Sequence, residues 1–306
     1  MLQSTRTRLR PLKASEILDE AVELYKRNAW LYISIAAILY IPTLILDPTV
    51  SGEHAFMYAQ DLRGMTSLFI SVAWYLLIAG PIITGALTYA VSECYLGRSV
   101  NIWQCFAEVL KWRLLSSMVF TNLIIILIIA FGCSIPVFLL VMGLTLIMSG
   151  STGFTSGVFI LSVAMISVVI PAYISARLAL AVPSIVLERN GIIAALHRTR
   201  QLTFRRAGRV FGVIFIVLIV TSIIQGLIAA PSSYAMARSV IEGSGTPLLV
   251  KIINSTIQVI TSAVLMPAGS IVTLLLYFDC RIRDEGYDLQ VLAEEIASLN
   301  NENMNL

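Results

Sequence analysis

The chain carries little charge, and its longest stretch without any charge dominates the sequence. Asp, Glu, Lys and Arg make up 13% of the 306 residues, against about 25% in soluble domains, while hydrophobic residues reach 58%. No charged residue lies between Arg113 and Arg177, so positions 114 to 176 form an uncharged run of 63 residues. As one helix that run would extend roughly 95 Å, about three times a ~30 Å hydrocarbon core. These deficits exclude a soluble protein and predict a polytopic membrane protein.

Histidine and cysteine are also scarce, which leaves little material for catalysis or metal binding. The two histidines, His54 and His197, fall on opposite sides of the membrane in the topology given below. The four cysteines show no metal-ligand spacing, and we expect them to be reduced thiols. The sequence also lacks serine-hydrolase, zinc-protease and phosphate-loop motifs. We therefore expect no enzyme activity, no bound metal and no cofactor.

Six apolar stretches are long enough to cross a membrane as helices. They are residues 29–46, 66–92, 117–148, 156–182, 208–230 and 252–278. The charge-free run divides at Ser149–Gly153, because this is its only cluster of turn-forming residues. The predicted fold class is all-α: a single membrane domain over residues 1–306, with six transmembrane helices forming three helical hairpins linked by cytoplasmic amphipathic helices.

Lysine and arginine gather on one side of these spans. Eighteen of them lie in the N-terminal segment 1–28, the connections 93–116 and 177–209, and the tail 279–306, whereas three lie in the opposite loops. The positive-inside rule then predicts that both termini are cytoplasmic and that the protein resides in the cell (cytoplasmic) membrane. The net charge of +3 is too small and dispersed to indicate nucleic-acid binding.

Each cytoplasmic stretch has the apolar periodicity of an amphipathic helix. The four predicted helices cover residues 15–28, 101–113, 191–206 and the segment that begins at Asp288. An amphipathic helix followed by a two-span hairpin therefore occurs three times, which suggests a threefold repeat. The alternative is that interfacial tyrosines and flanking charges mark the helix ends of any polytopic protein.

Charged residues at the cytoplasmic ends of the even-numbered spans are candidates for an ionic cluster. They are Glu93, Arg177, Asp279 and Arg281. If the hairpins pack around one axis, Glu93 would face an arginine. The alternative is that each long side chain extends independently to the membrane surface.

An arginine-rich segment precedes the fifth span and is the best candidate for a specific interaction. Its members are Arg198, Arg200, Arg205, Arg206 and Arg209. Beside a membrane-entering helix these side chains should attract anionic lipid headgroups, with about 1 kcal/mol from each near the surface. Ordinary positive-inside bias is the alternative explanation.

Three stretches of the sequence carry a family resemblance. They are Arg10-Pro11-Leu12 with Ser15–Asp19 and Leu24–Asn28, then Ala181–Glu188 with Ala194–Leu196, and finally Leu275–Arg283 with Glu285–Leu289. Together they resemble the glycerophosphoryl diester phosphodiesterase membrane-domain family. The resemblance implies a six-helix prokaryotic membrane domain, which some members attach to a soluble phosphodiesterase barrel. The chain lacks the His-Arg-Gly signature and metal-binding carboxylates of such barrels, so no catalytic residue carries over.

These features favour a non-enzymatic integral membrane protein that contacts or organises lipids of the bilayer, partner membrane proteins or further copies of itself. The alternative is a transporter or channel for a small or lipid-like substrate. A polar cavity joining Asn122, Gln225 and Gln258 would favour transport. Interhelical hydrogen bonding by these residues and by Asn254 is the more usual role of polar side chains in spans.

Overall fold

The computed structural model describes residues 12–46, 66, 69–70, 72–148, 154–204, 206–242 and 248–285, and the regular structure in these ranges is helical. Five helical stretches within them are long and apolar enough to cross a membrane. They are Trp74–Tyr95, Trp112–Ile147, Phe154–Glu188, Ala207–Ser239 and Leu249–Asp284. The all-α class and the multi-pass membrane character are therefore confirmed. The five stretches correspond to the second to sixth predicted spans.

The first predicted span belongs to a longer helix, α2 (Ala14–Leu46), which is not one of the five. The backbone of α2 leaves helical geometry at Asn28, where φ is −127°. This kink separates the predicted amphipathic helix 15–28 from the apolar segment 29–46. In the apolar segment Tyr32 and Ile35 are fully buried.

The second predicted span contains a π-helical turn. The segment η1 (Trp74–Ala79) runs directly into α4 (Gly80–Tyr95), and the Gly80 N–H donates to the Tyr75 carbonyl five residues back. The Gly80 N–H is used by Tyr75 and Pro81 has no N–H, so the Leu76 carbonyl accepts instead from the Asn122 side-chain amide at 2.7 Å. π-Helical turns are usually short local insertions of this kind.

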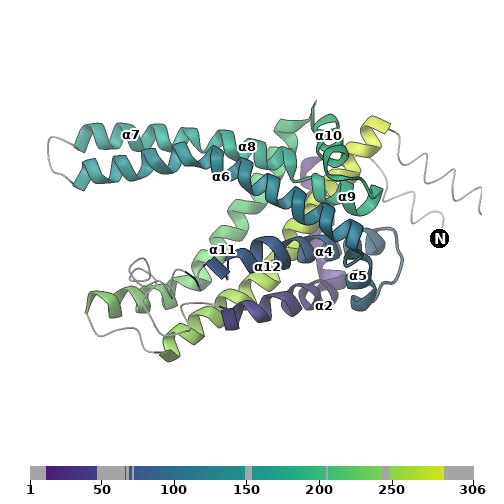
Figure 1. Ribbon diagram of the computed structural model, residues 1–306, viewed down its shortest axis with the longest axis horizontal. Helices are drawn as coiled ribbons and strands as arrows, with labels where there is room; N and C mark the ends of the chain where they lie inside the picture. Colours follow the sequence, from purple (N-terminus) through teal and green to yellow (C-terminus); the bar gives the residue numbers. More distant parts are fainter. Residues whose placement is uncertain are drawn as a thin grey trace, which may run out of the picture.

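Two hairpins diverge from a common base (Figure 1). The first joins α6 (Trp112–Met148) to α7 (Phe154–Ser167), which continues as α8 (Val169–Leu178) and α9 (Ala181–Glu188). The second joins α11 (Ala207–Ile241) to α12 (Leu248–Glu285). The turn predicted at 149–153 lies outside the described residues, between the ends of α6 and α7. Figure 1 also shows α11 running from the side of α8 down to α12, so that α11 connects the two hairpins at their base.

Short helices gather at that base. Helix α10 (Ile192–Thr203) agrees with the amphipathic segment predicted at 191–206. Helix α5 (Ile102–Val109) covers most of the segment predicted at 101–113, which breaks after Val109 because residues 112–113 begin α6. Burial raises the pKa of Cys105 in α5 to about 12, and all four cysteines are free thiols, as expected. The amphipathic helix predicted from Asp288 lies outside the described residues.

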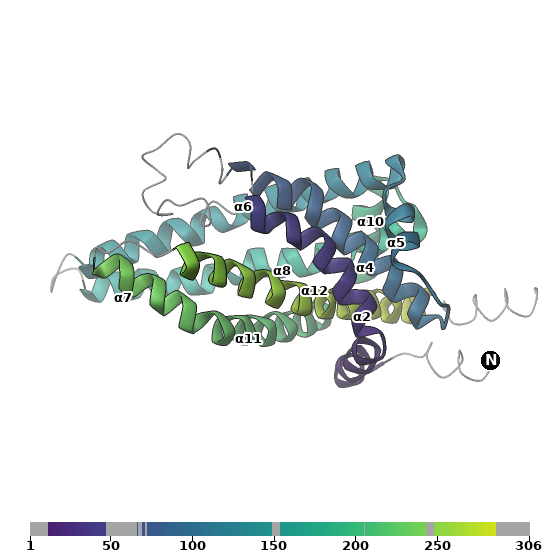
Figure 2. The same cartoon turned by 90° about the horizontal axis from the view of Figure 1, so that it is seen from below.

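Protein packing is uneven along the molecule. Helix α12 is buried at the base through Ile271, Leu274, Leu275 and Phe278, and α2 lies along it (Figure 2). The hairpin arms expose large apolar side chains instead, such as Phe131 on α6, which is 84% exposed. In an integral membrane protein such surfaces face lipid tails or another membrane protein.

The two arms of the first hairpin touch through glycine. A Cβ added at Gly157 would lie 2.8 Å from the Gly143 carbonyl oxygen and 3.0 Å from the Ile147 backbone nitrogen. Both of these atoms belong to the backbone of α6, so they cannot move aside as a flexible side chain could. The close approach of α6 and α7 therefore depends on the missing side chain at Gly157.

Gly157→Ala should separate α6 from α7 and lower the free energy of unfolding by about 1–3 kcal/mol, the usual cost of overpacking. Gly212→Ala is the matched control, because a Cβ there meets no atom within 4 Å. The control should leave stability unchanged or raise it by up to about 1 kcal/mol through helix propensity. Unfolding in detergent micelles, followed by circular dichroism, measures both. Equal effects of the two substitutions would contradict the glycine contact.

Candidate functional site

A buried carboxylate at the end of α12 joins three parts of the chain. The Asp279 side chain is 2% exposed. Its Oδ1 accepts hydrogen bonds from the Leu12 backbone N–H and from Arg283 Nε, both at 2.9 Å, and its Oδ2 lies 3.1 Å from Arg209 Nη1. Both arginines also donate to the Leu12 carbonyl oxygen. We call these four residues the N-terminal network, because they fix the start of the described chain against α11 and α12.

A second carboxylate joins α9 and α10 to the same part of α12. The two oxygens of Glu188 accept a bidentate pair of hydrogen bonds from Arg198 Nε and Nη2, each at 3.1 Å. The Tyr277 hydroxyl donates to the same carboxylate, as does the Asn190 side-chain amide at 2.8 Å, and Arg281 Nε lies 3.5 Å away. We call these five residues the α9 network.

The two networks lie on opposite faces of one helix. Tyr277 and Arg281 are four residues apart and share one face of α12, and Asp279 and Arg283 share another. A shift of two residues turns a helix by about 200°, so the second pair points away from the first. Helix α12 is therefore held between α9 and α10 on one side and α11 and the N-terminal segment on the other. Hydrogen bonds to ionised groups are stronger than those between neutral groups, so the two networks should hold this part of α12 rigidly.

The arginine-rich segment contributes mainly to internal ion pairs. Arg198 belongs to the α9 network and Arg209 to the N-terminal network, while Arg206 pairs with Asp284. The sequence alone does not show which carboxylate each arginine pairs with, because each carboxylate lies on another helix. Arg200 lies at the surface in a pocket of about 280 Å³ with His197, Gln201 and Phe204. Arg205 lies outside the described residues.

The four residues predicted as one ionic cluster divide among different partners. Asp279 and Arg281 lie in the two separate networks on α12. Glu93 forms its ion pair with Arg98 at 3.6 Å, so it does face an arginine, but one from the adjacent turn. The Arg177 guanidinium lies 5.9 Å from the ring centre of Tyr173, four residues earlier in its own helix. The four residues therefore do not form one cluster, and the prediction did not include Glu188, which contacts Arg198, Tyr277, Asn190 and Arg281.

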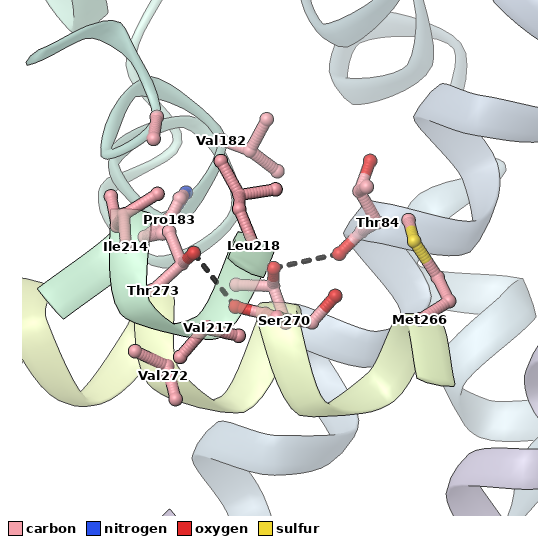
Figure 3. A pocket seen from close by; sticks show the side chains of 13 residues that line it. Thr84, Val182, Pro183, Ile214, Val217, Leu218, Met266, Ser270, Val272 and Thr273 are labelled. Carbon is pink, nitrogen blue, oxygen red and sulfur yellow. Dashed lines mark hydrogen bonds between the residues drawn. The ribbon is translucent and has the colours of Figure 1, made fainter. Parts of the chain in front are cut away.

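A cavity of about 260 Å³ lies next to the networks, where α4, α9, α11 and α12 meet (Figure 3). Its polar atoms are mostly hydroxyl groups that are satisfied within their own helices. Thr88 donates to Thr84 O at 2.7 Å, and Thr273 donates to Gly269 O at 2.8 Å. The remaining lining is dominated by aliphatic side chains. They include Val182, Ile214, Val217, Leu218, Met266 and Val272. The cavity therefore suits an apolar ligand such as an acyl chain.

The polar residues of the spans do not converge on this cavity. Asn122 hydrogen-bonds to η1, and Asn254 Oδ1 accepts a hydrogen bond from Ser232 Oγ of α11 at 2.7 Å, so both link helices. Gln225 and Gln258 are exposed on the hairpin arms. None of these four lines the cavity. The arrangement does not favour a polar path through the protein.

The described residues also contain no group of three or more His, Cys, Asp or Glu side chains placed to bind a metal ion. His197 is exposed on α10, and His54 lies outside these residues. The two most buried carboxylates at the base, Asp279 and Glu188, are each neutralised by arginines.

No protein-family model, no curated protein and no solved structure matches the chain. The family resemblance of the sequence therefore remains a prediction. The three stretches that carry it do meet in space, because Leu12 contacts Asp279 in one network and Glu188 contacts Tyr277 in the other. The residues that carry the resemblance are thus residues that hold the base together.

Asp279→Asn should lower the free energy of unfolding by about 3 kcal/mol, because it leaves Arg209 and Arg283 without their carboxylate in a partly buried site. Asp284→Asn is the matched control. That side chain is 31% exposed and pairs only at the surface with Arg206, so its loss should change stability by less than about 1 kcal/mol. Denaturant unfolding of both purified variants measures the difference, and equal losses would contradict the dominance of the N-terminal network.

Proposed function

We propose that the chain is a non-enzymatic membrane scaffold that contacts and organises lipids and partner membrane proteins. One observation carries the proposal. Helices α6 and α11 are apolar and long enough to cross a bilayer. In the most apolar 18-residue part of each helix, the rest of the protein buries only 6%. Such large apolar surfaces must be covered by lipid tails or by another membrane protein. Because protein buries so little of these two helices, most of their surface is available to lipid tails or to a partner membrane protein.

The proposed topology has six spans in three hairpins, with the first span in the second part of α2 and both termini in the cytoplasm. Its support is the positive-inside bias together with the interfacial helices at the base. Trp103 and Trp112 are 75% and 80% exposed there, as expected for side chains at headgroup level. The base would then lie at the cytoplasmic surface of the cell membrane.

The proposed lipid contact has an apolar and a polar part. The cavity beside α12 would receive an acyl chain, because its walls are aliphatic and its hydroxyls are mostly satisfied. The exposed Arg200 would contact anionic headgroups, and the sequence assigns Arg205 the same role. Membership of the glycerophosphoryl diester phosphodiesterase membrane-domain family is part of this proposal, supported by the contacts among the three resembling stretches.

Gly269→Leu tests the cavity. Gly269 lines it, and a Cβ there meets no atom within 4 Å, so a larger side chain can enter the empty space. We expect the variant to fold with unchanged or higher stability, since Gly is about 1 kcal/mol less favourable in a helix than Leu. Less lipid should co-purify with it, as measured by mass spectrometry of lipid extracted from the purified protein.

Gly226→Leu is the matched control, because Gly226 is exposed on α11, away from the cavity, and has equally free space. It should retain the lipid content of the wild type. If Gly269→Leu retains the same lipids as this control, the cavity holds no acyl chain.

Single cysteines introduced into a cysteine-free variant test the proposed topology. Ser99→Cys lies at the base, in the exposed turn after α4, and should react with a membrane-impermeant maleimide only after the cells are opened. Ser151→Cys lies in the predicted outer loop and should react in intact cells. The reverse pattern would overturn the orientation, and reaction of both in intact cells would overturn the span count.

A further inference from the structure

A second cavity at the base has a different character from the apolar one beside α12. It measures about 550 Å³ and lies where α5, the start of α6 and the connection between α9 and α10 meet. Its lining includes three cations and one carboxylate, with an exposed tryptophan at its rim. These are Lys111, Arg113, Arg189, Glu108 and Trp112.

The charges of this cavity are not balanced within the protein. Glu108 accepts from Lys111 and also from Arg189, at 2.9 Å, so a single carboxylate faces two cations. Arg113 forms no ion pair with any residue that the structure describes. The cavity therefore carries an excess of positive charge, which a bound anion would offset.

A helix begins at the same cavity. Gly191 lines it and precedes the first turn of α10, and no side chain caps this helix end. The first intrahelical hydrogen bond there runs from Ala195 N–H to the Gly191 carbonyl. The backbone N–H groups of the first turn are unpaired within a helix by geometry and favour a negative charge. The positive end of the α10 dipole therefore adds to the positive potential at the cavity.

Arg189 is held where it lines this cavity by an uncommon backbone conformation. Its φ is 54°, in the left-handed region that favours glycine, and the residue ends α9. An L-residue pays roughly 1–2 kcal/mol in this region. Glycine or asparagine would satisfy the backbone with less strain, so the arginine is not explained by the turn.

We propose that this cavity binds a phosphate group, and that the phosphate belongs to the headgroup of an anionic phospholipid of the cytoplasmic leaflet. The three cations and the open end of α10 supply the recognition of phosphate, and the exposed Trp112 sits beside them as interfacial tryptophans do. The assignment of a lipid source rests on the proposed function and topology. A free phosphate compound would satisfy the same groups, and the experiment separates the two.

The experiment uses the full-length protein in uncharged detergent micelles, titrated separately with phosphatidylglycerol, phosphatidylcholine and inorganic phosphate. Bound ligand is counted by native mass spectrometry. The wild type should bind phosphatidylglycerol more tightly than phosphatidylcholine. Arg113→Gln should weaken phosphatidylglycerol binding by about fivefold, the change that corresponds to about 1 kcal/mol for a cation near the surface.

Gly191→Asp is a second variant that should keep the fold. Gly191 has ordinary backbone angles and free space around a Cβ, and Asp is a favoured residue at this position of a helix. The added carboxylate would cap α10 and repel the phosphate, so binding should fall by about fivefold or more while thermal stability is kept.

Arg98→Gln and Ser99→Asp are the charge-matched controls, because both positions are exposed at the base and neither lines the cavity. Both should bind phosphatidylglycerol as the wild type does.

If the cavity variants and the controls bind equally while the wild type prefers phosphatidylglycerol, the cavity is overturned and the proposed lipid contact stands. If the wild type shows no preference between the two lipids and binds no inorganic phosphate, both proposals fail. Inorganic phosphate that displaces phosphatidylglycerol at equal concentration would overturn the lipid source and leave the phosphate site.

Discussion

The charged side chain of Asp279 is only 2% exposed. The groups that compensate its charge belong to three different parts of the chain. Arg209 begins α11, Arg283 ends α12, and the Leu12 backbone precedes α2. A buried carboxylate is costly unless it is both ion-paired and hydrogen-bonded, so these three segments have to meet there. The position of α12 follows, because the opposite face of the same turns is held by Glu188. The base of the molecule is built around these two carboxylates.

The rest of the architecture depends on this base. The hairpins α6–α7 and α11–α12 leave it in diverging directions, and within each hairpin the two helices pack against each other (Figure 1). In a bilayer the arms need no hydrophobic core of their own, because lipid tails are as apolar as leucine side chains. The two arms of the first hairpin approach each other closely at the small residues Gly143 and Gly157. Ion pairs and buried side chains are thus concentrated at the base, and exposed apolar surface is concentrated in the hairpin arms.

Much of the fold could be predicted because hydropathy and helical periodicity are local properties. The charge-free run predicted two spans and the turn between them, and α6 and α7 end and begin at its borders. Helices α5 and α10 lie within segments predicted to be amphipathic, and the kink at Asn28 falls where the amphipathic and apolar parts of α2 join. The candidate site was harder to predict. Arg198, Arg206 and Arg209 look equally free in the sequence, although their carboxylates lie on other elements, 10 to 78 positions away.

The sequence by itself determined that the chain is all-α and crosses a membrane several times, because both conclusions need only the spacing of apolar and charged residues along the chain. Only the tertiary structure decided which charges neutralise one another. It paired Arg198, Arg209 and Arg206 with Glu188, Asp279 and Asp284, and it left an excess of positive charge beside Arg113. The reason is physical: an ion pair depends on distance in space, and the low-dielectric interior penalises any buried charge that packing leaves without a partner.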